Sequence, residues 1–423
     1  MKFNKTSQLV AAAVASLAVA SLVTACSTRT VDFVYVTSSK AAGSNNYGSI
    51  DVFEINSGSG KMRQIPSSPF PSAGRLPVAE AVSADYKNLF VVNEDDNTIV
   101  QFVIGNDGKL YPFNTVNTPG IFPLAVTTNK SNLFVVDLYQ PLPLCSDADP
   151  CSGSMAVYPV VAGAGGSSSA SNPCTASVCL GTPVTNTTIG AQYWPLTLPS
   201  APSDVIVPTA VNVLASGAFA YVTAYDSSVT PNRGLIFGFA VGSGGALSPL
   251  NGGVPHDMGV GSQGLGIRPS GVASDPTSSY VYVTDSTNGI VVGYSIASGT
   301  LAEIQDTPTG NQPSAVVVDP VYPYVYVANA LDGTVSAYSM SSGALSNLGT
   351  YTVGSDPVAI GIDPSTEHFL FTANFLDNTV SGFELSATAG TLLESQFSPY
   401  NASVNPTAVA AIPHNGIGAG IAK

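Results

Sequence analysis

Positive charge is scarce in this sequence of 423 residues, which has 13 Lys and Arg against 27 Asp and Glu and a net charge of −14. This balance repels phosphate-rich surfaces, so we expect no nucleic-acid partner. Histidine occurs three times, which leaves few ordinary bases for catalysis. No G-x-S-x-G elbow, Walker loop or H-E-x-x-H pair occurs, and these absences exclude the sites that such motifs build.

The residues before Cys26 predict a signal peptide, residues 1–25, instead of part of the fold. Lys2 and Lys5 give a positive start, residues 9–23 are almost continuously apolar, and the letters L-V-T-A-C end at Cys26. The segment resembles a bacterial lipoprotein signal, which implies that Cys26 becomes the lipidated first residue. The alternative is ordinary cleavage after an A-x-A-like site, with Cys26 as a free thiol.

In both cases we expect export to the cell envelope. With lipidation the protein is held in the membrane by acyl chains, at the outer membrane or the periplasmic face. Cleavage before Cys26 removes two lysines and no acids, so the mature charge becomes 11 − 27 = −16.

The other four cysteines lie in one stretch, and an exported protein is free to oxidise them. Of the three possible pairings we favour the two local ones, Cys145 with Cys151 and Cys174 with Cys179. No C-x-x-C spacing or nearby histidine supports a metal site, so we expect none. Residues 138–203, which hold these cysteines, break the spacing of the repeats, and we expect a disulfide-bearing insertion that caps one rim.

The most informative pattern is a sequence motif that occurs four times, in residues 89–102, 280–296, 324–340 and 369–385. Each copy is a β-branched and aromatic run, a polar turn with Asp, Asn or Gly, and a second such run. This arrangement predicts the same β-hairpin each time.

Seven prolines each open a short apolar run and set the number of repeats: Pro77, Pro123, Pro208, Pro269, Pro313, Pro357 and Pro406. The steps from Pro269 to Pro313 and from Pro313 to Pro357 are both 44 residues. Four short strands in about 40 to 50 residues are typical of one propeller blade.

The two ends of the chain complete each other. Residues 33–36 and 49–53 supply middle strands of a blade that lacks an inner strand, and residues 406–412 supply an inner strand with nothing after it. We therefore expect an all-β, seven-bladed propeller of four-stranded antiparallel blades, closed by pairing of the N- and C-terminal strands. One propeller domain would span residues 26–412, followed by a tail at 413–423, and both faces of each inner strand would be buried.

Several of these motifs resemble known families. Val91-Val92-Asn93-Glu94 resembles the wording of YVTN propeller repeats, and Val135-Val136-Asp137-Leu138 resembles the V-x-D-L-G segment of exported propellers similar to 6-phosphogluconolactonase. The resemblance implies a lactonase-type propeller. The histidines usual in that family are replaced, because Pro123 is followed by Leu124 and the usual P-R-H becomes Arg268-Pro269-Ser270.

Opening a lactone needs a base and a group that stabilises the oxyanion, so we name catalytic candidates. Glu80 stands where other inner strands carry valine or isoleucine, and a buried carboxylate is either perturbed for function or part of a structural contact. Asp137, Arg233 and Arg268 complete the candidates. Gly259 to Gly264 matches G-x-G-x-x-G, but no strand precedes it and no helix follows it, so we expect no cofactor.

A second candidate site is the rim formed by the turns after the second strand of each blade. We expect its ligand-binding residues to be Asn93, Glu94, Asp285, Asn329 and Asn374. Turn geometry alone also explains Asp and Asn at these places.

Two functions remain open on the sequence. The first is a monomeric binding or scaffolding propeller that meets a small molecule or an envelope protein at one face, with the membrane as its partner through Cys26. The second is a lactonase-like hydrolase of a sugar lactone or related ester, which requires a base and a cation to converge near the channel.

Overall fold

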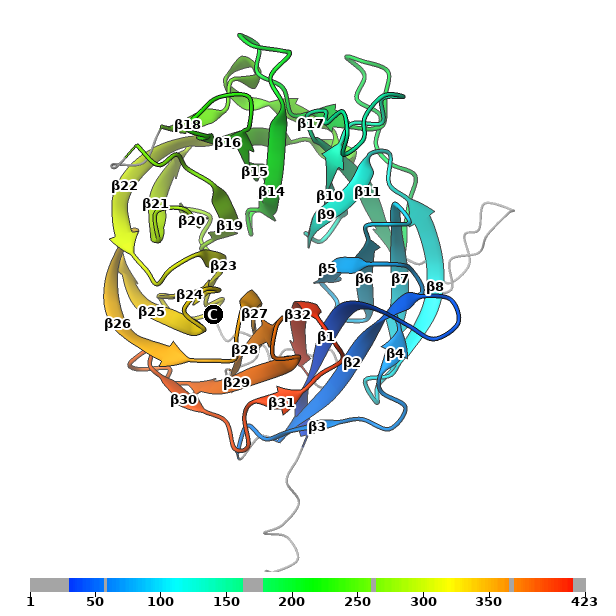
Figure 1. The fold of residues 1–423 in the computed structure, drawn as a ribbon, viewed down its shortest axis with the longest axis vertical. Helices are drawn as coiled ribbons and strands as arrows, with labels where there is room; N and C mark the ends of the chain where they lie inside the picture. Colours follow the sequence, from blue (N-terminus) through cyan, green and yellow to red (C-terminus); the bar gives the residue numbers. More distant parts are fainter. Residues whose placement is uncertain (1–29, 57–58, 163–177, 260–263, 365–368, 414–423) are drawn as a thin grey trace, which may run out of the picture.

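The computed structural model describes residues 30–56, 59–162, 178–259, 264–364 and 369–413, and in these ranges the chain forms seven small antiparallel sheets around a central axis (Figure 1). Each sheet is one blade, and its strands run outward from the axis in chain order, except that the inner strand of blade 1 comes from the end of the chain. The expected seven-bladed, all-β propeller is therefore confirmed. None of the described helices is long and apolar enough to cross a membrane.

The strands of the first three blades are given from the axis outward, and where a blade has five strands the last two pair with different ends of its third strand. Blade 1 contains β32 (Pro406–Pro413), β1 (Thr30–Ala42), β2 (Tyr47–Asn56), β3 (Met62–Gln64) and β4 (Phe70–Pro71). Blade 2 contains β5 (Pro77–Val82), β6 (Asn88–Asn93), β7 (Thr98–Ile104) and β8 (Leu110–Asn117). Blade 3 contains β9 (Ile121–Thr128), β10 (Asn132–Tyr139), β11 (Ser154–Ala162), β12 (Val178–Leu180) and β13 (Trp194–Pro195).

The other four blades follow the same order. Blade 4 contains β14 (Ile206–Val213), β15 (Phe219–Asp226), β16 (Arg233–Val241), β17 (Leu247–Pro249) and β18 (His256–Gly259), with the short 3-10 turns η1 (Ser243–Gly245) and η2 (Leu250–Gly253). Blade 5 contains β19 (Pro269–Ser274), β20 (Tyr280–Asp285), β21 (Ile290–Ala297) and β22 (Thr300–Pro308). Blade 6 contains β23 (Pro313–Val318), β24 (Tyr324–Asn329), β25 (Thr334–Ser341) and β26 (Ala344–Thr352). Blade 7 contains β27 (Pro357–Ile362), β28 (Phe369–Asn374), β29 (Thr379–Leu385), β30 (Leu392–Glu394) and β31 (Tyr400–Asn401).

The two ends of the chain close the ring in blade 1. Strand β1 pairs with β32, with Val34 opposite Ala411 and Val36 opposite Val409. The other edge of β1 pairs with β2, where Val34 faces Phe53. The expected closure is therefore present, and it removes the open edges that an unclosed sheet would expose.

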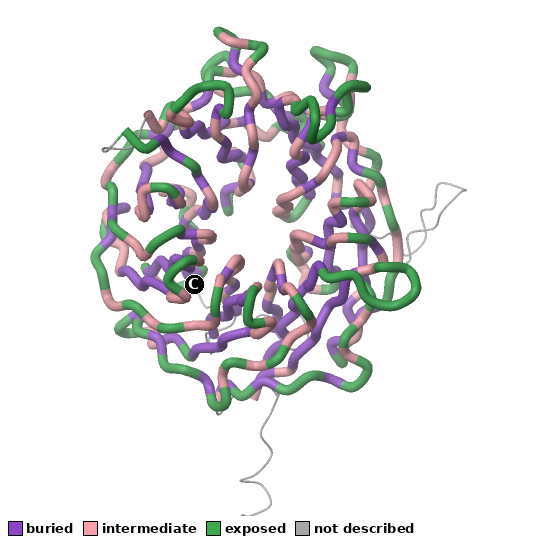
Figure 2. The backbone as a smooth tube through the Cα atoms, viewed as in Figure 1, coloured by how far each residue is buried: buried purple, intermediate pink, exposed green. Residues whose placement is uncertain are grey.

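Burial peaks one strand away from the axis (Figure 2). All six residues of β6, β24 and β28 are buried, whereas most residues of the inner strands β5 and β27 are only half-buried. The expectation that both faces of each inner strand are buried was too strong, because the inner strands face the axis on one side. Seven apolar clusters, each shared by two neighbouring blades, form the core.

A tyrosine in the second strand of several blades links it to the next blade. Tyr35, Tyr221, Tyr282 and Tyr326 donate their hydroxyls to the backbone carbonyls of Gly108, Gly299, Gly343 and Gly390. Each of these glycines lies in the turn between the third and fourth strands of the following blade. Because a buried phenol needs a partner, this contact gives a physical reason for the recurring tyrosine in the repeat.

Residues 138–203, expected to be one insertion, supply the outer half of blade 3. Strand β11 is the third strand of that blade, and the short strands β12 and β13 pair with different ends of it. The loop between β10 and β11 carries the Cys145–Cys151 disulfide, as predicted. Cys174 lies outside the described residues, so its pairing with Cys179 stays a prediction.

Candidate functional site

The seven inner strands begin on one face of the disk, which we call the proline face because each strand has one of the seven prolines there. The residue before the proline has a positive φ in five blades: Leu76 (49°), Phe122 (58°), Gln312 (51°), Asp356 (55°) and Asn405 (58°). This region is unusual for residues other than glycine and especially before proline. Strained backbone conformations of this kind are frequent at functional sites in proteins.

Directly after each proline the pairing with the second strand shifts by one residue, as between Pro269 and Gly271 or between Pro313 and Ala315. A β-bulge of this kind redirects a side chain. The bulged residues Ser270 and Ser314 donate their hydroxyls to the carbonyls of Pro313 and Pro357 in the next blade. The proline face is thus fastened from blade to blade by side-chain hydrogen bonds.

Four of the five predicted rim residues are buried. Asn93, Asp285, Asn329 and Asn374 each end a second strand and have 0% exposure. Asp285 accepts the Arg268 N–H at 3.1 Å, and Asn329 accepts the Gly310 N–H at 3.1 Å. Asp285 and Asn329 therefore hold the turn before the inner strand of their blades.

Glu94 differs from the other predicted rim residues, because it is half-buried. Burial raises the pKa of its carboxyl, and the nearby carboxylates of Asp95 and Asp147 raise it further. It lies in the turn between β6 and β7, on the proline face.

Glu80 lies between blades 1 and 2. Its Oε2 accepts the hydroxyl of Thr37 on β1, and its carboxylate also accepts the backbone N–H of Ala410 on β32. The other oxygen, Oε1, is buried and has no hydrogen-bond partner. Burial raises the pKa of Glu80 to about 8, despite the two hydrogen bonds, which lower it. Glu80 therefore connects blade 2 to both ends of the chain.

The remaining catalytic candidates have separate partners. Asp137 is buried at the end of β10, where its Oδ2 accepts the Gly120 N–H at 3.2 Å and burial raises its pKa to about 7. Arg233 forms an ion pair with Asp257, at 2.5 Å, beside the outer strand β18. Figure 1 shows β5, which carries Glu80, across the axis from β19, which follows Arg268. The structure thus does not bring the four predicted catalytic residues together.

Arg268 is the predicted residue that does line a cavity. The cavity measures about 700 Å³ and lies on the proline face of blades 5, 6 and 7. Six of its polar lining residues are Arg268, Ser270, Asn288, Asn311, Gln312 and Asp356.

The Arg268 guanidinium is held in place from the side of blade 4. It lies 4.8 Å from the ring centroid of Tyr225, and its Nε donates to the Asn232 side-chain oxygen at 2.8 Å once that amide is oriented to satisfy both groups. Stacking and a hydrogen bond together fix a planar cation facing a polar cavity.

Asp356 is a site residue that the sequence reasoning missed. It immediately precedes Pro357, lines the same cavity as Arg268, and has its pKa raised by burial. Gln312 holds the matching place before Pro313. Alignment of the blades on their prolines identifies both positions. The Asn and Asp residues selected from the sequence instead end the second strands, and these are buried.

Histidine does not reach this cavity in the described part of the chain. His256 is half-buried on β18 and packs edge-on against Tyr294, with 5.1 Å between the ring centroids. Burial lowers its pKa. His368, His414 and Cys26 lie outside the described residues.

Comparisons with known proteins agree with this architecture. The family described as "Lactonase, 7-bladed beta-propeller" matches residues 253–362 and 280–414, two overlapping stretches. A "putative 6-phosphogluconolactonase" from Bacteroides fragilis is similar over 91% of this chain and 99% of its own, with 19% identity and a TM-score of 0.66. A periplasmic gluconolactonase from Pseudomonas aeruginosa is similar over 90% of this chain and 99% of its own, with 18% identity and a TM-score of 0.64.

The comparison with curated proteins gave no match. At identities below 20%, the likeness to the solved structures establishes the fold. The chain is therefore a seven-bladed β-propeller that matches the lactonase family over blades 5, 6 and 7 and the closing strand β32.

Proposed function

We propose that the protein is an exported, lipid-anchored, monomeric propeller that binds a polyhydroxylated small molecule at the proline face of blades 5, 6 and 7. One observation carries the proposal, namely the cavity of about 700 Å³ beside Arg268. Its hydroxyl and amide groups suit a ligand rich in hydroxyls, because such a ligand both donates and accepts hydrogen bonds.

Export and anchoring rest on the residues before Cys26. The lipoprotein-like signal supports attachment at the outer membrane or the periplasmic face. The periplasmic location in the description of the Pseudomonas aeruginosa protein supports an envelope location as well.

The placement of the predicted catalytic residues supports binding over catalysis. Glu80 contacts blade 1, Asp137 holds the turn at Gly120, and Arg233 is paired with Asp257. A hydrolase needs a base and an oxyanion-stabilising group at one place, and these residues have separate partners in different blades.

A sugar-lactone hydrolase is the second candidate, and one specific observation favours it. Asp356 and Arg268 line the same cavity, and burial raises the pKa of the Asp356 carboxyl. In that reaction Asp356 would take a proton from the attacking water, while Arg268 would donate hydrogen bonds to the oxygen that gains negative charge.

Glucono-1,5-lactone and gluconate are suitable probes for both candidates. Calorimetry measures binding, and acid release above the uncatalysed rate measures hydrolysis. The binding proposal predicts that the wild type binds without accelerating hydrolysis, and that Arg268→Ala weakens binding by about ten-fold or more, as expected for loss of a charge-assisted hydrogen bond.

Arg63→Ala is the matched control, because Arg63 is an exposed arginine on the outer strand of blade 1. If the wild type hydrolyses the lactone and Asp356→Asn abolishes this hydrolysis, the second candidate replaces the binding proposal. Equal binding by the wild type and Arg268→Ala would refute both.

A further inference from the structure

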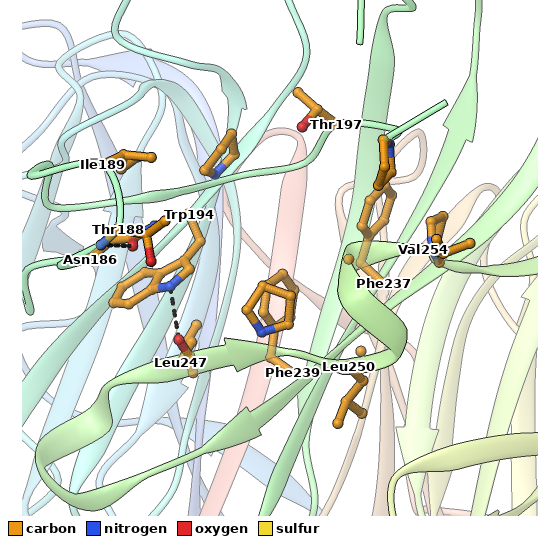
Figure 3. Close-up of a pocket in the computed structure, with 16 residues that line it drawn as sticks. Asn186, Thr188, Ile189, Trp194, Thr197, Phe237, Phe239, Leu247, Leu250 and Val254 are labelled. Atoms are coloured by element: carbon orange, nitrogen blue, oxygen red, sulfur yellow. Dashed lines mark hydrogen bonds between the residues drawn. The ribbon is translucent and has the colours of Figure 1, made fainter. Parts of the chain in front are cut away.

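A second cavity lies between blades 3 and 4, beside the outer strand β17 (Figure 3). Its volume is about 220 Å³. One wall comes from the segment around β13, including Trp194, and the other from β16, β17 and η2 of blade 4, including Phe237 and Phe239.

The aromatic wall is fixed in place. Trp194, Phe237 and Phe239 are at most 4% exposed. The indole Nε1 of Trp194 donates to the Leu247 carbonyl at 3.1 Å, which ties blade 3 to the outer strand of blade 4 (Figure 3). A cavity whose walls are packed in this way is largely formed before a ligand enters, so ordering the walls costs little on binding.

The lining carries no Asp, Glu, Lys, Arg or His, although the whole chain has a net charge of −14. A charged ligand would lose its hydration here without gaining a partner of opposite charge. The volume exceeds the roughly 150 Å³ of a cavity known to hold benzene, so one ring with a small substituent fits.

Blade 4 leaves two residues of β16 without an outer strand. Strand β17 pairs with residues 239–241 of β16, and β18 pairs with residues 234–236. Phe237 and Gly238 lie between these two strands. Gly238, which faces the aromatic Tyr221 of the second strand, lines the cavity.

Blades 1 and 7 have the same interruption, and there a serine fills it. Val52, which faces Tyr35, donates its N–H to Ser68 Oγ at 2.9 Å. Gly382, which faces Phe371, donates its N–H to Ser398 Oγ at 3.1 Å.

Blade 4 has no such serine. The residues between β17 and β18 read L-N-G-G-V-P, from Leu250 to Pro255, without a hydroxyl. The segment that supplies a serine hydroxyl in blades 1 and 7 therefore offers no hydroxyl to the Gly238 N–H in blade 4, and Gly238 lines the cavity.

We propose that this cavity is a second binding site, for a small neutral molecule with one ring and one hydrogen-bond acceptor, such as an aryl ketone. The ring packs against Trp194 and the two phenylalanines. The acceptor takes the position of the missing serine oxygen and accepts the Gly238 N–H. This site lies on different blades from the cavity beside Arg268 and does not depend on the proposed function.

Trp194 makes the test direct, because it is the only tryptophan in the sequence and it lines the cavity. Its fluorescence is titrated with acetophenone, with ethylbenzene, which lacks the acceptor, and with benzoate, which is charged. We expect saturable quenching by acetophenone. Binding of ethylbenzene is measured by its competition with acetophenone. We expect ethylbenzene to bind about five-fold more weakly than acetophenone, because it lacks one net hydrogen bond. We expect benzoate not to bind.

Val254→Phe narrows the cavity from its exposed side, since Val254 is 52% exposed and its replacement disturbs no core contact. Acetophenone should bind this variant at least ten-fold more weakly. Leu393→Phe, at a 68% exposed position of blade 7, is the matched control and should bind as the wild type does.

Three results would overturn the proposal: quenching of the wild type that rises linearly without saturation, equal affinity in Val254→Phe and the wild type, or binding of benzoate as strong as that of acetophenone. Equal affinity for acetophenone and ethylbenzene would refute the role of the Gly238 N–H.

Discussion

Glu80 makes the stability of the ring depend on pH in a direction opposite to that of most carboxylates. Burial raises its pKa from an ordinary value of 4.5 to about 8 in the folded protein. A carboxyl whose folded pKa is raised stabilises the fold fully below its unfolded pKa, and this contribution is lost as the pH rises through the folded pKa. Ionisation places a negative charge on a carboxylate whose buried Oε1 has no hydrogen-bond partner.

The magnitude follows from the two pKa values. One pKa unit corresponds to about 1.4 kcal/mol, so the shift of Glu80 lowers the free energy of unfolding by about 3 kcal/mol between about pH 5.5 and about pH 8.5. Glu80→Gln cannot ionise, and we expect its stability to lose that part of the pH dependence.

Urea unfolding of the wild type and Glu80→Gln at both pH values measures this difference. Glu80→Val is a matched second variant, because valine stands at the equivalent position of five other blades, at Val126, Val211, Val272, Val316 and Val409. Parallel stability curves for the wild type and both variants across this pH range would refute the role of Glu80 at the seam between blades 1 and 2.

Three further predictions concern other contacts in the ring. Asp137→Asn introduces the residue that ends the second strand in other blades. Because burial raises the pKa of Asp137 to about 7, this substitution should raise the free energy of unfolding above about pH 7 and change it little below pH 5. Urea unfolding in both pH ranges checks this. Ser314→Ala should cost about 1 kcal/mol in the same assay, since the Pro357 carbonyl loses a donor. Reduction of the Cys145–Cys151 disulfide should leave the thermal midpoint nearly unchanged but speed proteolysis of the loop between β10 and β11, because only six positions separate the cysteines.

Sequence reasoning reached the architecture because each blade repeats the same physical solution. The proline at the start of the inner strand and the apolar second strand recur, so register and closure at Val34 and Ala411 could be predicted. The outer half of blade 3 could not, because β12 and β13 have three and two residues and carry no readable alternation.

The candidate site was harder to predict than the fold. The side chains that line the cavity beside Arg268, such as Gln312 and Asp356, come from the turns before the inner strands, and their identity changes from blade to blade. The Asn and Asp residues that do recur, such as Asn329, are buried and bond the turn before the inner strand, which gives a structural reason for their recurrence. Repetition therefore identified structural residues, while the candidate binding residues lie where the repeats differ.

Ligand binding on the proline face of blades 5, 6 and 7 can be tested by hydrogen exchange with and without a saturating sugar lactone. We predict slower exchange in peptides around Arg268, Asn288, Asn311 and Asp356, with no change around Glu80 or Asp137. Protection confined to other blades, or none at these four residues when calorimetry shows the lactone bound, would rule out binding at the proline face of blades 5, 6 and 7.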